Sequence, residues 1–138
     1  MNREDFDIAN KEDFAQYVVR PQKDIPETEL VEGSLSHLVD TDGLTISFLR
    51  MEKHSAFEVH SHVQEQIMIV TKGNCDEIID GKCYHVKKGD VIRLPSGVPH
   101  GAFINEEDCY AIDLFIGGRP DYIQKFYQQN SEAVLPYR

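Results

Sequence analysis

Three histidines in this chain are spaced so that they could bind one metal ion. His60 and His62 stand two residues apart in a run typical of a β-strand, and His100 follows the turn predicted at Pro95–Gly97. Side chains two apart on a strand point to the same face, so the first two imidazoles can converge on one ion. Gln66, at the start of the next apolar run, offers an oxygen donor. Three imidazoles and one oxygen suit a first-row transition metal with open positions for water or substrate.

Strict strand alternation also predicts which neighbours share the histidine face. It places Glu58 on the same face as His60 and His62. Phe57 and Val59 are then expected to face the other way.

Glu65 is an alternative to Gln66 as the fourth ligand. If Met68 and Val70 point into the interior, Gln66 points in with them and Glu65 points out. A one-residue bulge would reverse this assignment. Alternation favours Gln66 as the ligand, and Met68 is then expected to line the substrate pocket. Because an amide ligand is neutral, the ion would keep its full charge, which favours polarising a carbonyl or hydroxyl over activating oxygen.

A second group of candidate residues lies in and just beyond the last apolar run. Asp113 interrupts the run Cys109–Ile116, Phe115 shares its face, and Arg119 follows the run. A buried carboxylate is costly unless it is paired. Asp113 could therefore bond to loop amides or to Arg50 without any chemical role, or act as a general acid or base near the metal. In the second interpretation Arg119 would hold a substrate carboxylate through two hydrogen bonds.

Short strands separated by turns are the elements that must position these residues. Turn residues such as Asp80-Gly81 separate runs of β-type residues that recur about every eight to twelve positions, with no helix between them. This spacing predicts an all-β antiparallel barrel or jelly roll. The predicted strands cover residues 44–50, 57–62, 67–71, 75–79, 83–86, 91–94, 98–104 and 109–116.

The two ends of the chain differ from this pattern. Residues 1–28 are expected to form an arm with one short helix, which Asn10 caps with Asp13 at the third helical position. Residues 29–138 are expected to form the barrel and a short C-terminal helix over 121–131. Because a small barrel has open edges, we expect the arm to pack on the barrel or on a second subunit, and the protein to be a homodimer.

Length and composition exclude several classes of function. The chain has 138 residues, 41% of them hydrophobic, which suits one core. Fourteen Lys and Arg against twenty-four Asp and Glu give a net charge of −10, which disfavours nucleic acid and anionic membranes as partners. There is no apolar run long enough to span a membrane and no secretory signal. Three cysteines without CxxC spacing indicate a reducing compartment, so a cytoplasmic location is expected.

Two longer runs around the candidate ligands resemble the signature motifs of the cupin superfamily. The run from His60 to Gly73 reads HSHVQEQIMIVTKG, and the run from Gly89 to Asn105 reads GDVIRLPSGVPHGAFIN. The first run lacks the family's leading glycine and has Gln66 where the family has glutamate, and Asn105 falls one residue late. The resemblance implies a double-stranded β-helix, the cupin jelly-roll barrel. It also implies one divalent transition metal ion (Zn, Ni, Mn, Fe or Co) held by the three histidines and Gln66.

Further residues resemble a subgroup of cupins. HxHxxEQ from His60 to Gln66, and DxFxxxR from Asp113 to Arg119 followed by PxY, are similar to the small cupins of pectin and alginate breakdown. Those enzymes convert 4,5-unsaturated uronates, the products of polysaccharide lyases, into linear keto sugars. The resemblance implies that Asp113 moves the proton, that Phe115 contacts the substrate and that Arg119 holds the uronate carboxylate.

Three functions therefore stay open on the sequence. The features above favour a metal-dependent isomerase-like or hydratase-like enzyme that acts as a Lewis acid on a small hydroxylated carboxylate. A metal-dependent dioxygenase would use the same histidines. A small-ligand-binding cupin without catalysis is the third alternative.

Overall fold

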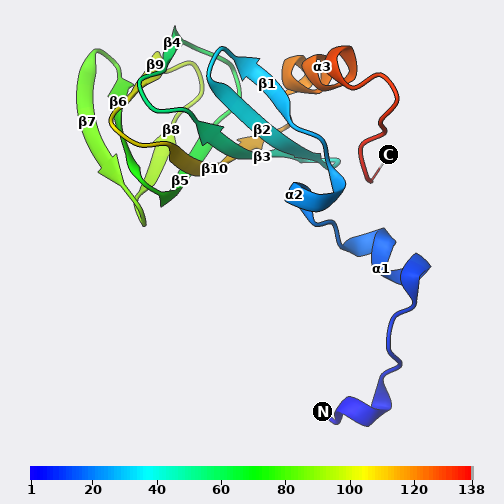
Figure 1. Cartoon of the computed structure of the whole chain (residues 1–138). Coiled ribbons are helices and arrows are strands. Elements are labelled where there is room, and N and C mark those ends of the chain that lie inside the picture. The colour runs from blue at the N-terminus through cyan, green and yellow to red at the C-terminus, as the bar shows by residue number, and fades with distance from the viewer. Residues whose placement is uncertain (138) are drawn as a thin grey trace.

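Two antiparallel sheets form the protein, as seen in a computed structural model that describes residues 1–137 (Figure 1). The larger sheet has six strands in the order β1-β2-β3-β10-β5-β8, and the smaller has four in the order β4-β9-β6-β7. The prediction of an all-β fold with a short C-terminal helix is confirmed. The strands are β1 (Thr28–Val31), β2 (Ser34–Asp40), β3 (Leu44–Met51), β4 (Ala56–His60), β5 (Gln66–Lys72), β6 (Asn74–Ile79), β7 (Lys82–Lys87), β8 (Val91–Leu94), β9 (His100–Ile104) and β10 (Cys109–Ile116).

The core lies between the sheets because alternate side chains of each strand point inward. Buried and partly exposed residues alternate along the whole of β3 and nearly all of β10, which pair with each other in the middle of the larger sheet. The C-terminal helix α3 (Pro120–Gln129) lies near β1 and buries Tyr122 and Phe126 (Figure 1). Strand alternation therefore decides which polar residues reach the interior.

One strand breaks this alternation at the histidines. Phe57 of β4 pairs with Ala102 of β9, whereas His60 pairs with His100, so β4 carries one extra residue. The bulge puts Phe57 on the same side as His60 and leaves Glu58 exposed. The prediction that Glu58 shares the histidine face is therefore wrong. β4 and β9 approach so closely here that a Cβ added to Gly101 would lie 2.5 Å from the Phe57 carbonyl oxygen.

The β6–β7 hairpin follows its predicted turn. Asp80 and Gly81 both have positive φ, at 49° and 80°, as a two-residue type I′ turn requires. The strands pair without a register shift from Asn74 opposite Lys87 to Ile79 opposite Lys82. β7 is one of the two edge strands of the smaller sheet, and it lies at the end of the barrel opposite α3 (Figure 1).

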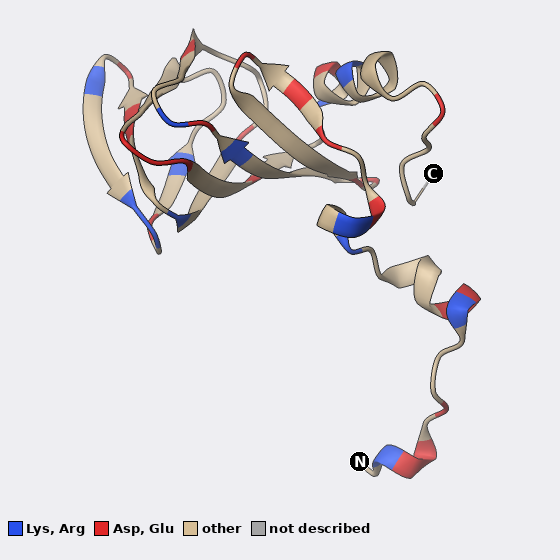
Figure 2. Ribbon diagram, in the orientation of Figure 1, with Lys and Arg blue, Asp and Glu red and all other residues tan. Residues whose placement is uncertain are grey.

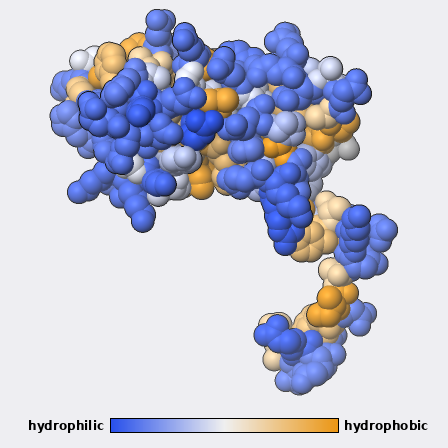
Figure 3. All heavy atoms as spheres, viewed as in Figure 1, coloured by the Kyte–Doolittle hydropathy of each residue, from blue (hydrophilic) through white to orange (hydrophobic). Residues whose placement is uncertain are grey.

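The N-terminal arm extends away from the barrel (Figure 1). Its helices η1 (Arg3–Asp5), α1 (Lys11–Tyr17) and α2 (Pro21–Asp24) bury no residue. The predicted cap is confirmed, because Asn10 and Asp13 form a reciprocal capping box. Apolar side chains are exposed along the arm, among them Ile8 at 93% and Tyr17 at 80% (Figure 3). The packing of this arm on a second subunit stays a prediction.

Charged residues are spread over both parts of the molecule. Acidic and basic residues are interspersed along the arm and over the barrel (Figure 2). No helix of residues 1–137 is long and apolar enough to cross a membrane.

Candidate metal centre and active site

The three predicted histidines come together at one end of the barrel interior. One nitrogen from each of His60, His62 and His100 lies within 4.8 Å of the others. The bulged end of β4 supplies His60, the loop after it supplies His62, and the first residue of β9 supplies His100. Their ring centroids are 4.4 to 5.7 Å apart. This is the spacing of a three-histidine metal site.

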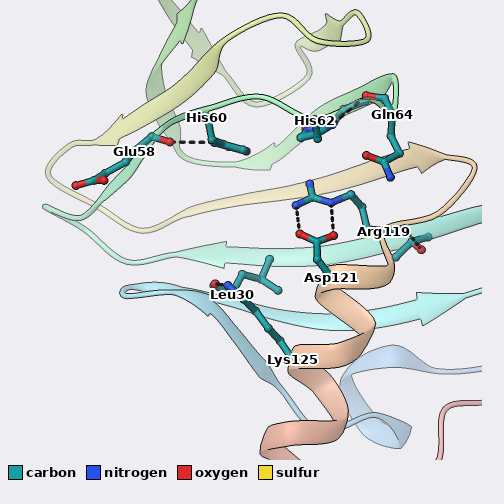
Figure 4. Close-up of polar contacts among 10 residues, drawn as sticks. Leu30, Glu58, His60, His62, Gln64, Arg119, Asp121 and Lys125 are labelled. Carbon is teal, nitrogen blue, oxygen red and sulfur yellow. Dashed lines mark hydrogen bonds and ion pairs between the residues drawn. The ribbon is translucent and has the colours of Figure 1, made fainter.

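Backbone carbonyls fix which nitrogen of each ring faces the centre. Nδ1 donates a hydrogen bond of 2.9 Å in each case, from His60 to Glu58 O and from His62 to Gln64 O (Figure 4), and from His100 to Val98 O. A neutral imidazole that donates from Nδ1 presents a lone pair at Nε2. Burial lowers the pKa of His62, and it lowers that of His100 to about 4, so both rings are held neutral. Neutral imidazoles with oriented Nε2 atoms are the form that binds metals.

Gln66, and not Glu65, points toward the histidines. Gln66 is 6% exposed, and its Oε1 lies 3.1 Å from His62 Nε2. Glu65 lies on the surface, where its Oε2 accepts a hydrogen bond of 2.8 Å from Arg93 Nε. Because His62 donates from Nδ1, its Nε2 and the Gln66 oxygen are two acceptors facing each other, an arrangement that a shared cation would stabilise. The residues present therefore fit a metal ion, with Gln66 as the fourth donor.

Asp113 lies beside Gln66 in the interior. It is 5% exposed, and it sits opposite Met68 of β5 and Ser47 of β3. Burial raises the pKa of Asp113 to about 7, against the opposing influence of the Gln66 amide and the Arg119 cation. The alternative of a pair with Arg50 is wrong, since Arg50 contacts two surface carboxylates at 3.4 and 3.5 Å.

Arg119 is the buried cation of this region. It is 4% exposed, and its Nε and Nη2 donate hydrogen bonds of 2.9 and 2.8 Å to Asp121 (Figure 4). Its guanidinium carbon lies 3.7 Å from the centre of the Tyr122 ring and 4.8 Å from that of Phe115. Asp121 thus occupies one side of the guanidinium and leaves its Nη1 end for another anion. The sequence analysis did not identify Asp121, although its position two residues after Arg119 at the start of a helix was a usable signal.

Phe115 and Met68 complete the walls. Phe115 is 1% exposed and meets the His62 ring edge-on at 5.7 Å. Met68 lines an inner cavity of about 30 Å³ next to the histidines, with room for an ion and a water molecule. An open cleft of about 780 Å³ lies outside it, and His60 and Tyr122 line both spaces. Arg119 lines the cleft, so a sugar-sized molecule in the cleft can contact both His60 and the guanidinium.

Glu77 is a second interior carboxyl that the sequence analysis missed. It is 3% exposed, and from β6 it lines the same inner cavity as Asp113 of β10. Burial, and then the charge of Asp113, raises the pKa of Glu77 to about 8. Alternation in β6, which buries Cys75 and Glu77 together, was the signal that could have found it.

The raised pKa of Glu77 predicts the pH dependence of stability. The folded protein keeps a proton on Glu77 up to about pH 8, whereas in the unfolded chain this carboxyl has its ordinary pKa of 4.5. This contribution to stability is complete below that lower value and is lost as the pH rises to about 8. Glu77→Gln is therefore expected to reduce the loss of unfolding free energy between pH 5 and pH 8 by roughly 2–4 kcal/mol. Urea unfolding of chelator-treated protein measures this difference.

The matched control for this experiment is Glu58→Gln. Glu58 is exposed, so its replacement should leave the pH dependence as in the wild type. If the unfolding free energies of the wild type and of Glu77→Gln change with pH in parallel, the prediction is contradicted.

Comparison with known proteins identifies the family. The family model described as "Cupin domain" matches residues 47–115, which is half of the chain. This segment runs from β3 to β10 and contains all three histidines, Gln66 and Asp113. No curated protein matches the chain.

Solved structures share the fold at low sequence identity. KdgF from a Halomonas species superposes with a TM-score of 0.65 at 24% identity, and the match covers 70% of this chain and 89% of that one. An RmlC-like cupin from Shewanella frigidimarina gives 0.71 at 21% identity, over 77% and 95% of the two chains. The polyketide cyclase RemF from Streptomyces resistomycificus gives 0.68 at 17% identity, over 75% and 80%. At these identities the likeness establishes the fold.

Proposed function

Since this chain belongs to the cupin domain family, we propose that it is a metal-dependent enzyme that acts on a small hydroxylated carboxylate. We infer that the substrate is a 4,5-unsaturated uronate and the product its linear keto isomer. The sequence resemblance to the small cupins of pectin and alginate breakdown, through HxHxxEQ and DxFxxxR, supports this substrate.

One observation carries the proposal. Among residues 1–137, three buried side-chain atoms have no hydrogen-bond partner, and they are His100 Nε2, Asp113 Oδ1 and Arg119 Nη1. Buried polar atoms are nearly always paired, so each such atom calls for an explanation. All three belong to the one candidate site. A nitrogen lone pair suits a metal ion, a carboxyl group suits proton transfer, and a guanidinium N–H suits a substrate carboxylate.

The metal would be held by His60, His62 and His100 with the oxygen of Gln66. A bound divalent ion acts as a Lewis acid that polarises a substrate oxygen, and the neutral glutamine leaves its charge undiminished. The three backbone carbonyls keep the imidazoles in the required tautomer before any ion binds. The chain therefore supplies a preorganised donor set for Zn, Ni, Mn, Fe or Co.

Arg119 and Asp113 would act on the substrate itself. The Nη1 end of Arg119 can donate to the uronate carboxylate while Asp121 and the Tyr122 ring hold the guanidinium in place. Opening the sugar ring breaks its C1–O5 bond, forms the C1 aldehyde and turns the C4=C5 enol into a ketone. The hydroxyl at C1 loses a proton and C4 gains one, so the reaction is an isomerisation. Asp113, whose pKa is raised by burial to about 7, can carry that proton.

The direct test is turnover of an unsaturated uronate. Full-length protein loaded with each candidate metal is incubated with the 4,5-unsaturated monouronate, and the absorbance of the conjugated double bond is followed. We expect this absorbance to fall with the metal-loaded protein and to stay constant with the chelator-treated protein. An unchanged substrate with every metal would overturn the proposal, and oxygen consumption in the same assay would favour a dioxygenase.

A further inference from the structure

A second cluster of metal-binding side chains lies on the β6–β7 hairpin. One ligand atom from each of Asp76, Cys83 and His85 lies within 4.8 Å of the others. Asp76 and His85 are direct cross-strand partners, and Cys83 precedes His85 by two residues on the same face of β7. The tight turn at Asp80-Gly81 and the regular pairing of the two strands hold the three side chains together.

This cluster is separate from the barrel interior. In β6 the buried neighbours Cys75 and Glu77 point inward, so Asp76 between them points outward. Cys83 is exposed, and the His85 side chain is 82% exposed. The hairpin therefore presents the cluster to solvent on the outside of the smaller sheet, and the histidine centre lies on its inside.

The three donor types are those that zinc uses in proteins. Thiolate sulfur, imidazole nitrogen and carboxylate oxygen all bind Zn²⁺, and thiolate favours zinc over harder ions such as magnesium. We propose that Asp76, Cys83 and His85 form a second metal site, selective for Zn²⁺, on the outer face of the β6–β7 hairpin. Three protein ligands leave the fourth tetrahedral position to water.

Binding of the ion replaces an existing contact. His85 Nδ1 and Asp76 Oδ1 are 2.5 Å apart, a short hydrogen bond. Two ligand atoms of a tetrahedral zinc ion are about 3.3 Å apart, so the side chains need to separate by less than 1 Å, about the freedom of exposed rotamers. As the ion binds, the Cys83 thiol releases a proton to solvent, and the neutral His85 ring carries its single proton on Nε2, so that Nδ1 presents a lone pair.

The exposed pair of His54 and Glu106 provides a comparison within the same molecule. His54 Nε2 lies 3.1 Å from Glu106 Oε2, and the described residues place no cysteine with them in a candidate metal group. This pair is an ordinary histidine–carboxylate contact. What distinguishes the hairpin cluster is the thiol as a third donor.

Cobalt absorption tests the proposal without any activity assay. Reduced, full-length protein is stripped with chelator and titrated with Co²⁺, whose bond to a thiolate gives a charge-transfer band in the near ultraviolet. The histidine centre has no cysteine among its ligands, and Cys75 and Cys109 are buried in the core, so this band reports Cys83 of the hairpin. We expect the band in the wild type, its loss on addition of Zn²⁺, which binds such sites more tightly than Co²⁺, and its absence in Cys83→Ser.

Further variants separate a built site from a reactive thiol. His85→Gln and Asp76→Asn are each expected to raise the Kd for Co²⁺ at least about tenfold, whereas the control His54→Asn leaves the Kd unchanged. His100→Ala should keep the band even though it damages the barrel centre, so the two sites can fail independently. The proposal is overturned if the wild type shows no band, if the band persists in Cys83→Ser, or if both His85→Gln and Asp76→Asn bind Co²⁺ as the wild type does.

Discussion

Asp113→Asn is expected to lower kcat for the unsaturated uronate by about 10²–10⁴-fold, the range for removing a general acid or base. Asparagine has the same shape as aspartate but cannot move a proton. Asp113 lies next to Gln66, and the charge of Arg119 acts to lower its pKa. It is therefore close to both the candidate metal site and the candidate carboxylate site. Metal content and the unfolding midpoint should stay close to the wild-type values. Loss of double-bond absorbance at saturating substrate measures the effect.

Glu77→Gln is the matched control for this variant. Glu77 is an equally buried carboxyl that lines the same cavity, with its pKa also raised by burial. It lies near Asp113 and makes no contact with Arg119. Its replacement should therefore leave kcat near the wild-type value. The reverse outcome, in which Glu77→Gln is inactive and Asp113→Asn is active, would assign the proton transfer to Glu77 and contradict the role of Asp113.

His100→Ala is expected to abolish metal binding at the barrel centre and, with it, uronate turnover. His100 is 4% exposed, and its Nε2 is one of the atoms without a partner. Two histidines and one amide are too few donors for a stable site of this kind. A ligand at one hundred times its Kd stabilises a folded protein by about 2.7 kcal/mol. We therefore expect metal to raise the unfolding free energy of the parent protein by that amount and to leave that of His100→Ala unchanged.

The experiment is best done in a Cys83→Ser background, so that the hairpin cannot contribute. Elemental analysis after dialysis gives the stoichiometry, and urea unfolding with and without metal gives the stabilisation. His54→Asn is the control, because His54 is an exposed histidine outside the site. Full metal occupancy in His100→Ala would contradict the prediction, because it would show that the ion binds outside the histidine centre.

The bulge in β4 shows where prediction from alternation reached its limit. Alternation placed Gln66 inside and Glu65 outside, and the regular pairing of β5 with β8 from Gln66 opposite Leu94 preserved that assignment. The same rule failed three residues before the end of β4, where an extra residue reversed Phe57 and Glu58. A bulge depends on how two strands meet in space, so local periodicity does not report it.

Two further differences concern buried charged side chains. Arg119 was expected to hold a substrate carboxylate through two hydrogen bonds, but the first turn of α3 brings Asp121 against its Nε and Nη2. Glu77 became an interior carboxyl because the smaller sheet folds over the larger one and closes water out of that face of β6. Both outcomes depend on the packing of whole elements.

The amino-acid sequence by itself determined the strands from β3 to β10, the Asp80-Gly81 turn and the set of donor types, because these follow from side-chain periodicity and backbone preferences within a few residues. Only the tertiary structure decided which nitrogens face the centre, which polar atoms lack partners and how the Arg119 guanidinium is shared. The hydrogen bonds join residues only two positions apart, but they depend on the backbone conformation that each segment takes in the fold. The unpaired atoms arise from burial, since desolvation acts on a side chain only after the barrel has closed around it.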